Sequence, residues 1–188
     1  MSLPVLTTRR LVLRPLQADD AEAVAALCGR DFAVARWLTS CSWPYEEGAA
    51  EAFVTAARAA DPARDEAVFA VTLGGVLIGS VAVQAPGDLS EAPDCPTLGY
   101  WIGRPFQRAG YSAEAAQAAL DWGFAMHACP AIAARAFEDN AASRAVLRRL
   151  GFRPAARTMR YAKALDRKVP TIVMRLGRAD FEARRIAA

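Results

Sequence analysis

Hydrophobic positions alternate with polar ones in some segments of the chain and recur every three to four residues in others. The alternating or continuously apolar segments predict strands at residues 10–16, 67–73, 76–84, 97–103, 132–137, 157–165 and 171–176. Helical spacing predicts helices at residues 19–27, 31–38, 46–60, 112–126, 141–150 and 178–186. Strand-helix-strand units alternate with hairpins in this order. The pattern therefore predicts an α/β fold with a mixed sheet and helices on both of its faces.

The length of the chain fits one hydrophobic core. Its 188 residues are enough for a well-buried domain and short for two. We find no internal repeat, low-complexity segment or linker. We therefore expect residues 1–188 to form a single domain.

Residues 104–116 indicate a loop that turns directly into a helix. Pro105 ends the preceding strand, Gly110 frees the backbone, and Ser112 can cap the helix that follows. The first N–H groups of such a helix lack partners and lie at the positive end of its dipole. Together with the cationic side chain of Arg108, they predict a binding site for a phosphate or pyrophosphate.

Composition narrows the class of protein. Hydrophobic residues make up 54% and charged residues 23%, as in ordinary soluble domains. We expect neither a signal peptide nor a membrane-spanning segment, and we expect a cytoplasmic protein. The four cysteines, Cys28, Cys41, Cys95 and Cys129, are scattered, and His127 is the single histidine. This spacing predicts no zinc site and fits free thiols in a reducing compartment.

Charge is distributed unevenly along the chain. Residues 1–143 carry 10 Lys/Arg and 17 Asp/Glu, whereas residues 144–188 carry 13 and 3. This asymmetry fits an acidic surface for a cationic substrate and a basic one for an anionic ligand, and equally fits two solvated faces. The basic segment has few interleaved aromatic residues, so we do not expect nucleic acid as a partner.

Three groups of residues resemble the GNAT superfamily of acyl-CoA-dependent N-acyltransferases. Gln107–Ser112 is similar to the family's [Arg/Gln]-x-x-Gly-x-[Gly/Ala] loop, with Ser112 in the last small-residue position. Asn140-x-x-Ser143, with the Leu-Gly-Phe that ends at Phe152, resembles the next family block. Residues 8–14, 43–45 and 176–181 resemble the RimJ/RimL-type subgroup. The resemblance covers nearly the whole chain and implies a mostly antiparallel sheet splayed between two neighbouring strands.

The resemblance implies acetyl-CoA as co-substrate and no metal. The pyrophosphate would lie on the amides of residues 108–112, and the pantetheine arm would run along residues 100–102 as an added strand. Asn140 would hydrogen-bond the arm, and Arg108, Arg144 or Arg148 would neutralise CoA phosphates. The candidate CoA-binding residues are Tyr100, Trp101, Ile102, Gln107, Arg108, Ala109, Gly110, Tyr111, Ser112, Asn140, Ser143 and Arg144.

Two residues are candidates for proton transfer. Ser143 stands where related enzymes place the donor to the leaving thiolate. The alternatives are a serine that gives the sulfur only a hydrogen bond and a serine that is a plain helix residue. Many relatives carry a carboxylate base at the position of Thr97, which departs from that pattern. Glu138 is the candidate base acting through a water, and its alternative is a solvated strand-end carboxylate.

Trp43 and Tyr45 are expected either in the wall of the substrate pocket or in the core.

These expectations combine into an N-acetyltransferase in which an amine attacks the bound thioester directly. No cysteine has an evident histidine partner, so we expect no covalent acyl-enzyme. The acceptor is either a protein N-terminal amine or a small cationic amine. An alternative of another class is a non-catalytic CoA-binding regulatory module. A monomer and a homodimer both fit the sequence.

Overall fold

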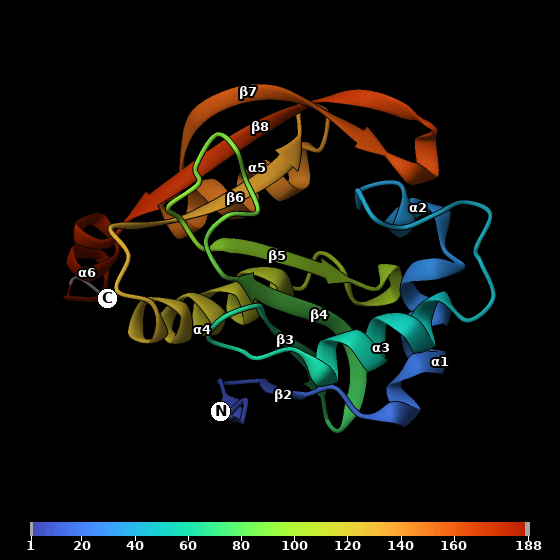
Figure 1. The fold of residues 1–188 in the computed structure, drawn as a ribbon. Coiled ribbons are helices and arrows are strands. Elements are labelled where there is room, and N and C mark those ends of the chain that lie inside the picture. Colours follow the sequence, from blue (N-terminus) through green and yellow to red (C-terminus); the bar gives the residue numbers. More distant parts are fainter. Residues whose placement is uncertain (1, 187–188) are drawn as a thin grey trace.

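An eight-stranded mixed sheet forms the centre of the protein in a computed structural model that describes residues 2–186 (Figure 1). The strand order is β1-β2-β3-β4-β5-β6-β8-β7. Every neighbouring pair is antiparallel except β5 and β6. The strands are β1 (Leu6–Thr7), β2 (Leu11–Pro15), β3 (Glu66–Leu73), β4 (Val76–Gln84), β5 (Thr97–Ile102), β6 (Ala131–Phe137), β7 (Arg153–Ala162) and β8 (Arg167–Gly177).

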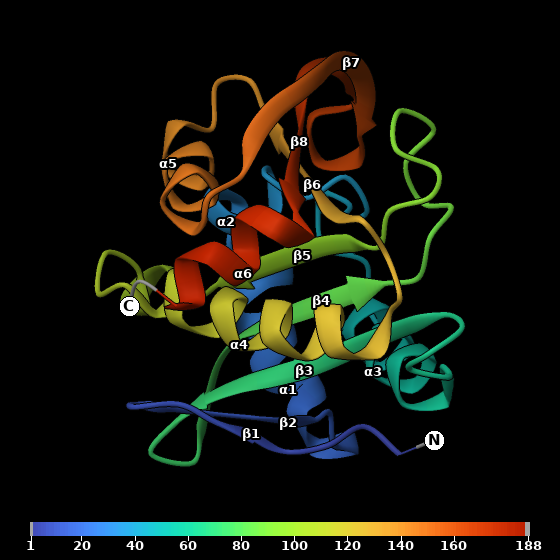
Figure 2. The same ribbon diagram turned by 90° about the vertical axis from the view of Figure 1, so that its left-hand side faces the viewer.

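Helices cover both faces of this sheet (Figure 2). One face carries α4 (Tyr111–Met126), α5 (Ala141–Leu150) and α6 (Arg178–Ile186). The opposite face carries α1 (Ala21–Val24) and α3 (Ala49–Ala59). A short helix, α2 (Phe32–Ala35), follows α1 through a π-helical turn.

Strand β3 shows how the sequence builds two hydrophobic cores. Successive side chains of a strand point to opposite faces of the sheet. Phe69 and Val71 therefore pack in the cluster beneath α4, whereas Val68 and Ala70 pack in the cluster beneath α1 and α3. A strand buried on both faces reads as a continuous apolar run, which is why β3 lacks simple alternation.

The parallel strands β5 and β6 separate soon after they begin. Only Thr97 with Ala133 and Leu98 with Ala134 are paired. Beyond Leu98 the two strands diverge, whereas β6 stays paired with β8, its neighbour on the other side, from Ala131 to Phe137. This gap confirms the expected splay of the mixed, mostly antiparallel sheet.

Several predicted boundaries were wrong by a few residues. Helix α3 begins at Ala49 rather than near residue 46, because Gly48 takes a left-handed conformation immediately before it. Strand β7 begins at Arg153 rather than residue 157, because pairing with β8 extends it past an irregularity near Pro154. Tertiary pairing overrides weak local strand propensity here.

Candidate active site

The loop of residues 107–112 leaves a row of backbone amides free. Arg108 has φ of 65° and Gly110 has φ of 83°, so the chain turns through the left-handed region twice. Within residues 2–186, no N–H group of residues 108–113 has a protein acceptor. These donors lie at the start of α4, where the helix dipole favours an anion. The arrangement suits a pyrophosphate.

The start of α4 differs from the prediction at Ser112. Gly110, not Ser112, is the residue at the N-cap position, and Ser112 lies inside the first helical turn. Position 110 requires a positive φ, which glycine adopts at little cost. The loop conformation therefore determines where the helix begins, and the side-chain preference of serine for caps does not.

One edge of β5 faces the gap. The N–H of Gly103 donates to the carbonyl of Ile78 on β4. Because backbone groups alternate in direction along a strand, the N–H and C=O of Tyr100 point the other way, toward β6. The side chain of Gln107 donates to the carbonyl of Ile102 at 2.9 Å and ties the loop to the end of β5. This edge can pair with an extended ligand.

The other predicted residues of β5 contribute mainly through their backbone. The side chain of Ile102 is buried beneath α4. The side chain of Trp101 packs against the cluster on the α1 and α3 side. Neither side chain is directed at the gap edge, so a ligand there would contact their peptide groups.

Tyr100 and Ser143 meet beside the gap. The phenol oxygen of Tyr100 lies 3.0 Å from Oγ of Ser143, and either group can donate. The phenol also lies 3.3 Å from the carbonyl oxygen of Ser143. Burial raises the pKa of Tyr100 to about 12, partly offset by the hydrogen bond to Ser143. The phenol therefore stays protonated at neutral pH and can donate to Ser143.

The first turn of α5 brings three predicted residues close together. The side-chain oxygen of Asn140 accepts a hydrogen bond from the N–H of Ser143 at 3.0 Å and caps the helix. This use leaves the amide NH₂ group of Asn140 for another partner. Arg144 turns back and donates to the carbonyl of Glu138 at 2.7 Å.

The carboxylate of Glu138 is held by Arg157. Two hydrogen bonds of 2.9 and 2.8 Å join the guanidinium to both carboxylate oxygens. This contact lowers the pKa of Glu138. A carboxylate with a lowered pKa is a weaker proton acceptor.

Thr97, where the family resemblance led us to look for a carboxylate base, is the first residue of β5. Its side chain is 4% exposed, and its hydroxyl has no partner among the described residues. A buried threonine cannot take the proton of an amine. Glu66 on β3 lies two strands away in register, and the carboxylate of Asp88 pairs with Arg135 at 2.6 Å.

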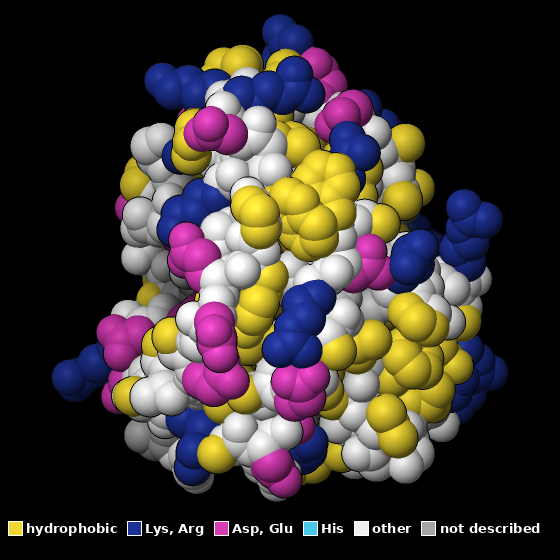
Figure 3. Space-filling view, turned by 90° about the vertical axis from the view of Figure 1, so that its right-hand side faces the viewer, with side chains coloured by type: hydrophobic (Ala, Val, Ile, Leu, Met, Phe, Trp, Pro, Cys, Tyr) yellow, Lys and Arg dark blue, Asp and Glu magenta, His cyan; other side chains and the backbone are white. Residues whose placement is uncertain are grey.

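The two predicted acceptor-site aromatics differ in exposure. Trp43 is 41% exposed and packs against Phe32, with ring centroids 5.2 Å apart. Tyr45 packs on the cluster beneath α3, and its hydroxyl accepts a hydrogen bond from the N–H of Ala50. Figure 3 shows hydrophobic side chains gathered on this side of the molecule, with acidic and basic side chains around them. Trp43 is therefore available to a ligand, whereas Tyr45 mainly supports the fold.

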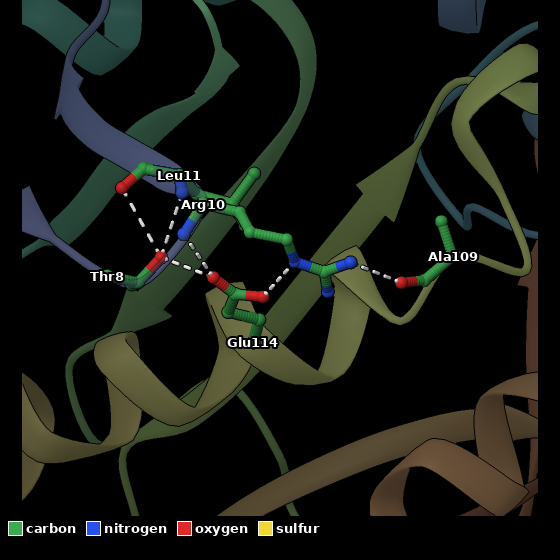
Figure 4. Close-up of polar contacts among 5 residues, drawn as sticks. All are labelled: Thr8, Arg10, Leu11, Ala109 and Glu114. Atoms are coloured by element: carbon green, nitrogen blue, oxygen red, sulfur yellow. Dashed lines mark hydrogen bonds and ion pairs between the residues drawn. The ribbon is translucent and has the colours of Figure 1, made fainter.

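Two residues that we did not predict from the sequence, Arg10 and Glu114, hold the 107–112 loop in place (Figure 4). Glu114 on α4 binds Arg10, with 2.7 Å between the carboxylate and Nε. Arg10 in turn donates to the carbonyl of Ala109 at 2.9 Å. The only sequence feature that pointed to these two residues was their place in the family-like segments at residues 8–14 and 107–116. Their contact spans 104 residues, so local spacing could not reveal it.

Other kinds of site have less support in the described part of the chain. Among residues 2–186, no group of three His, Cys, Asp or Glu side chains is arranged to hold a metal ion. No helix in this range is long and apolar enough to cross a membrane.

Comparison with known proteins identifies the family. The family model described as an acetyltransferase (GNAT) domain matches residues 10–153. No curated protein matches the chain. Among solved structures, the chain is similar to a candidate ribosomal-protein-serine acetyltransferase from Vibrio cholerae. The two share 25% identity over 94% of this chain and 99% of the other, with a TM-score of 0.73.

Two further structures share the fold at lower identity. RimJ of Mycobacterium smegmatis, in complex with CoA-disulfide, is 20% identical over 94% of this chain and 88% of its own, with a TM-score of 0.77. RimL, a ribosomal L7/L12 alpha-N-protein acetyltransferase in complex with coenzyme A, is 16% identical over 95% and 99%, with a TM-score of 0.79. The chain therefore belongs to the GNAT family of acetyl-CoA-dependent acetyltransferases and shares its fold with RimJ/RimL-type members.

Proposed function

We propose that the protein transfers an acetyl group from acetyl-CoA to a protein N-terminal amine by direct attack in a ternary complex. The observation that carries the proposal is the combination of free amides in residues 108–113 with the unpaired edge of β5. The first suits the pyrophosphate, and the second suits the amide-containing pantetheine arm. The two surfaces are contiguous, because Gln107 ties the loop to the end of β5.

In this proposal the backbone N–H of Tyr100 stabilises the oxyanion that forms when the amine nitrogen attacks the thioester carbonyl. The new C–N bond forms in this attack, and the C–S bond breaks when the oxyanion collapses to the amide carbonyl and the sulfur leaves with CoA. Ser143 gives its hydroxyl proton, or a hydrogen bond, to the departing sulfur, and the Tyr100 phenol can return a proton to Ser143 across 3.0 Å. Asn140 holds the arm through its free NH₂ group.

The amine must lose a proton during the reaction. We propose that water accepts it, because Thr97 has no basic group and the carboxylate of Glu138 is held by Arg157. Glu138 remains the nearest alternative, acting through a water at the end of β6.

Two observations favour a polypeptide acceptor. Phe32, the first residue of α2, and Trp43 form an exposed aromatic pair against which a chain segment could pack. The Vibrio cholerae protein at 25% identity is described as acting on a ribosomal protein. Acidic residues in this part of the chain, such as Asp31 and Glu47, are also compatible with a small cationic amine as acceptor.

The test is a two-substrate rate study across an acceptor panel. The panel contains peptides with free N-termini, their N-blocked counterparts that keep a lysine, and small polyamines. We expect intersecting rate patterns and acetylation of free peptide N-termini. Parallel patterns would contradict direct attack, because they indicate a covalent acyl-enzyme. Tight CoA binding without acetylation of any amine would favour a non-catalytic CoA-binding module.

A further inference from the structure

We propose that Arg10 is a positioning residue that aims the amides of the 107–112 loop at the CoA pyrophosphate, and that Glu114 and Thr8 hold Arg10 in place. This inference rests on the acetyl-CoA site proposed above. It assigns a role to the N-terminal segment, which lies outside the loop and the strands that line the gap.

The sheet holds the backbone of Arg10 in place. This residue directly precedes β2, whose residues pair with β3 from Leu11 to Pro15. Leu11 and Leu13 are fully buried in the core beneath α4. The backbone of Arg10 is therefore held on the sheet, and only its side chain spans the distance to the loop.

Glu114 orients that side chain. One oxygen of Glu114 accepts from the hydroxyl of Thr8 at 2.7 Å and from the N–H of Arg10 at 2.8 Å. The other oxygen accepts from Nε of Arg10 at 2.7 Å. These contacts lower the pKa of Glu114 against the opposing effect of burial, so the carboxylate is ionised at neutral pH.

The guanidinium of Arg10 makes two contacts with the loop. Its Nη1 donates to the carbonyl of Ala109 at 2.9 Å. Its central carbon also lies 4.4 Å from the centre of the Tyr111 ring, a cation–π contact. Arg10 thus touches the loop on both sides of Gly110.

Peptide geometry converts this contact into amide orientation. The carbonyl of Ala109 and the N–H of Gly110 belong to one planar trans peptide and point in opposite directions. When Arg10 draws the carbonyl toward β2, the N–H of Gly110 must point away from β2. In the sheet order, β6 and the gap lie on that other side of β5. The left-handed conformation of Gly110 needs such an external hold because glycine is otherwise free to rotate.

Simple charge attraction makes the opposite prediction for Glu114. If charge alone governed CoA binding, removing this carboxylate from the first turn of α4 would strengthen binding of an anion. If Glu114 positions Arg10, removing the charge loosens the loop and weakens binding. The sign of the change therefore separates the two explanations.

The experiment measures binding of CoA and of pantetheine, which keeps the arm and lacks the pyrophosphate. The variants are Arg10→Met and Glu114→Gln. We expect each to weaken CoA binding on the order of tenfold, the size of one lost hydrogen bond to a charged group. Pantetheine binding should change less than about twofold, because pantetheine has no pyrophosphate for the loop amides to bind.

Arg14→Met is the matched control. Arg14 lies on β2, four residues after Arg10, and pairs with Asp20 at 2.7 Å, and Asp20 likewise accepts a backbone N–H, from Gln17. This pair does not touch the loop, so the ratio of CoA to pantetheine affinity should equal that of the wild type. Tighter CoA binding by Glu114→Gln, or equal losses for CoA and pantetheine, would overturn the inference. Failure of the wild type to bind CoA would instead contradict the proposed function.

Discussion

The phenol of Tyr100 lies 3.0 Å from the hydroxyl of Ser143 at the edge of the gap between β5 and β6. A serine hydroxyl is a poor acid by itself, and a neighbouring donor makes it more effective. Since the pKa of Tyr100 is raised to about 12, the phenol supplies that donor throughout the neutral range. This pair is the centre of the proposed proton transfer to sulfur.

Ser143→Ala should lower kcat by about tenfold to a hundredfold with little change in the KM for acetyl-CoA, because the donor acts mainly in the transition state. Tyr100→Phe should give a smaller loss, and the double variant should be no worse than about the serine variant alone. Steady-state kinetics with a fixed amine checks this. Additive losses in the double variant would show that the two hydroxyls act independently.

Two substitutions of Asn140 should distinguish its role in capping the helix from its role in binding CoA. Asn140→Asp keeps an oxygen that can accept from the N–H of Ser143, so thermal stability should hold while CoA affinity falls about tenfold through the lost NH₂ donor. Asn140→Ala should lose both, with about 1 kcal/mol of stability. Thermal unfolding and CoA titration measure the two effects. Unchanged CoA affinity in Asn140→Asp would restrict this residue to capping.

Glu138→Gln should leave kcat within about threefold of the wild type, because water is the proposed proton acceptor and the exposed pair of Glu138 with Arg157 contributes little to stability. The acid limb of the pH–rate profile should also keep its position. Arg157→Gln is the matched variant, since it releases the Glu138 carboxylate from its two hydrogen bonds. Loss of activity and of the acid limb in Glu138→Gln would identify Glu138 as the base.

Cys41 should react with alkylating agents at lower pH than an ordinary thiol. Its sulfur lies 3.6 Å from that of Cys28, and the hydrogen bond from Cys28 lowers the pKa of Cys41 and raises that of Cys28. Because the thiolate is the reactive form, the lowered pKa shifts the reactivity curve toward acid. Cys28→Ala should move the curve back, and Cys28→Ser, which keeps a donor, should move it less. Mass spectrometry of alkylated peptides across pH would show this, and coincident curves would contradict it.

Local patterns predicted the parts of the site that local geometry determines. Asn140 and Ser143 lie three residues apart at a helix start, and the structure keeps that relationship. Ser112 misled the prediction because serine is a common cap, whereas the turn requires glycine at position 110.

Contacts between distant segments could not be predicted in the same way. Arg10 and Glu114 are ordinary surface charges in the sequence and meet only when β2 and α4 pack together. The partial burial of Tyr45 depends on its ring lying over the backbone of Gly29, where a Cβ atom would clash. Tertiary packing decides both, and neither leaves a periodic signal.

The most direct test of the proposed function compares one peptide with its N-terminally blocked copy as acceptors for acetyl-CoA. Release of CoA thiol is followed, and the position of the acetyl group is mapped by tandem mass spectrometry. We predict thiol release and α-amine acetylation with the free peptide alone, slowed by Ser143→Ala. Acetyl transfer to both peptides at a lysine, or thiol release that does not depend on the peptide, would contradict the account.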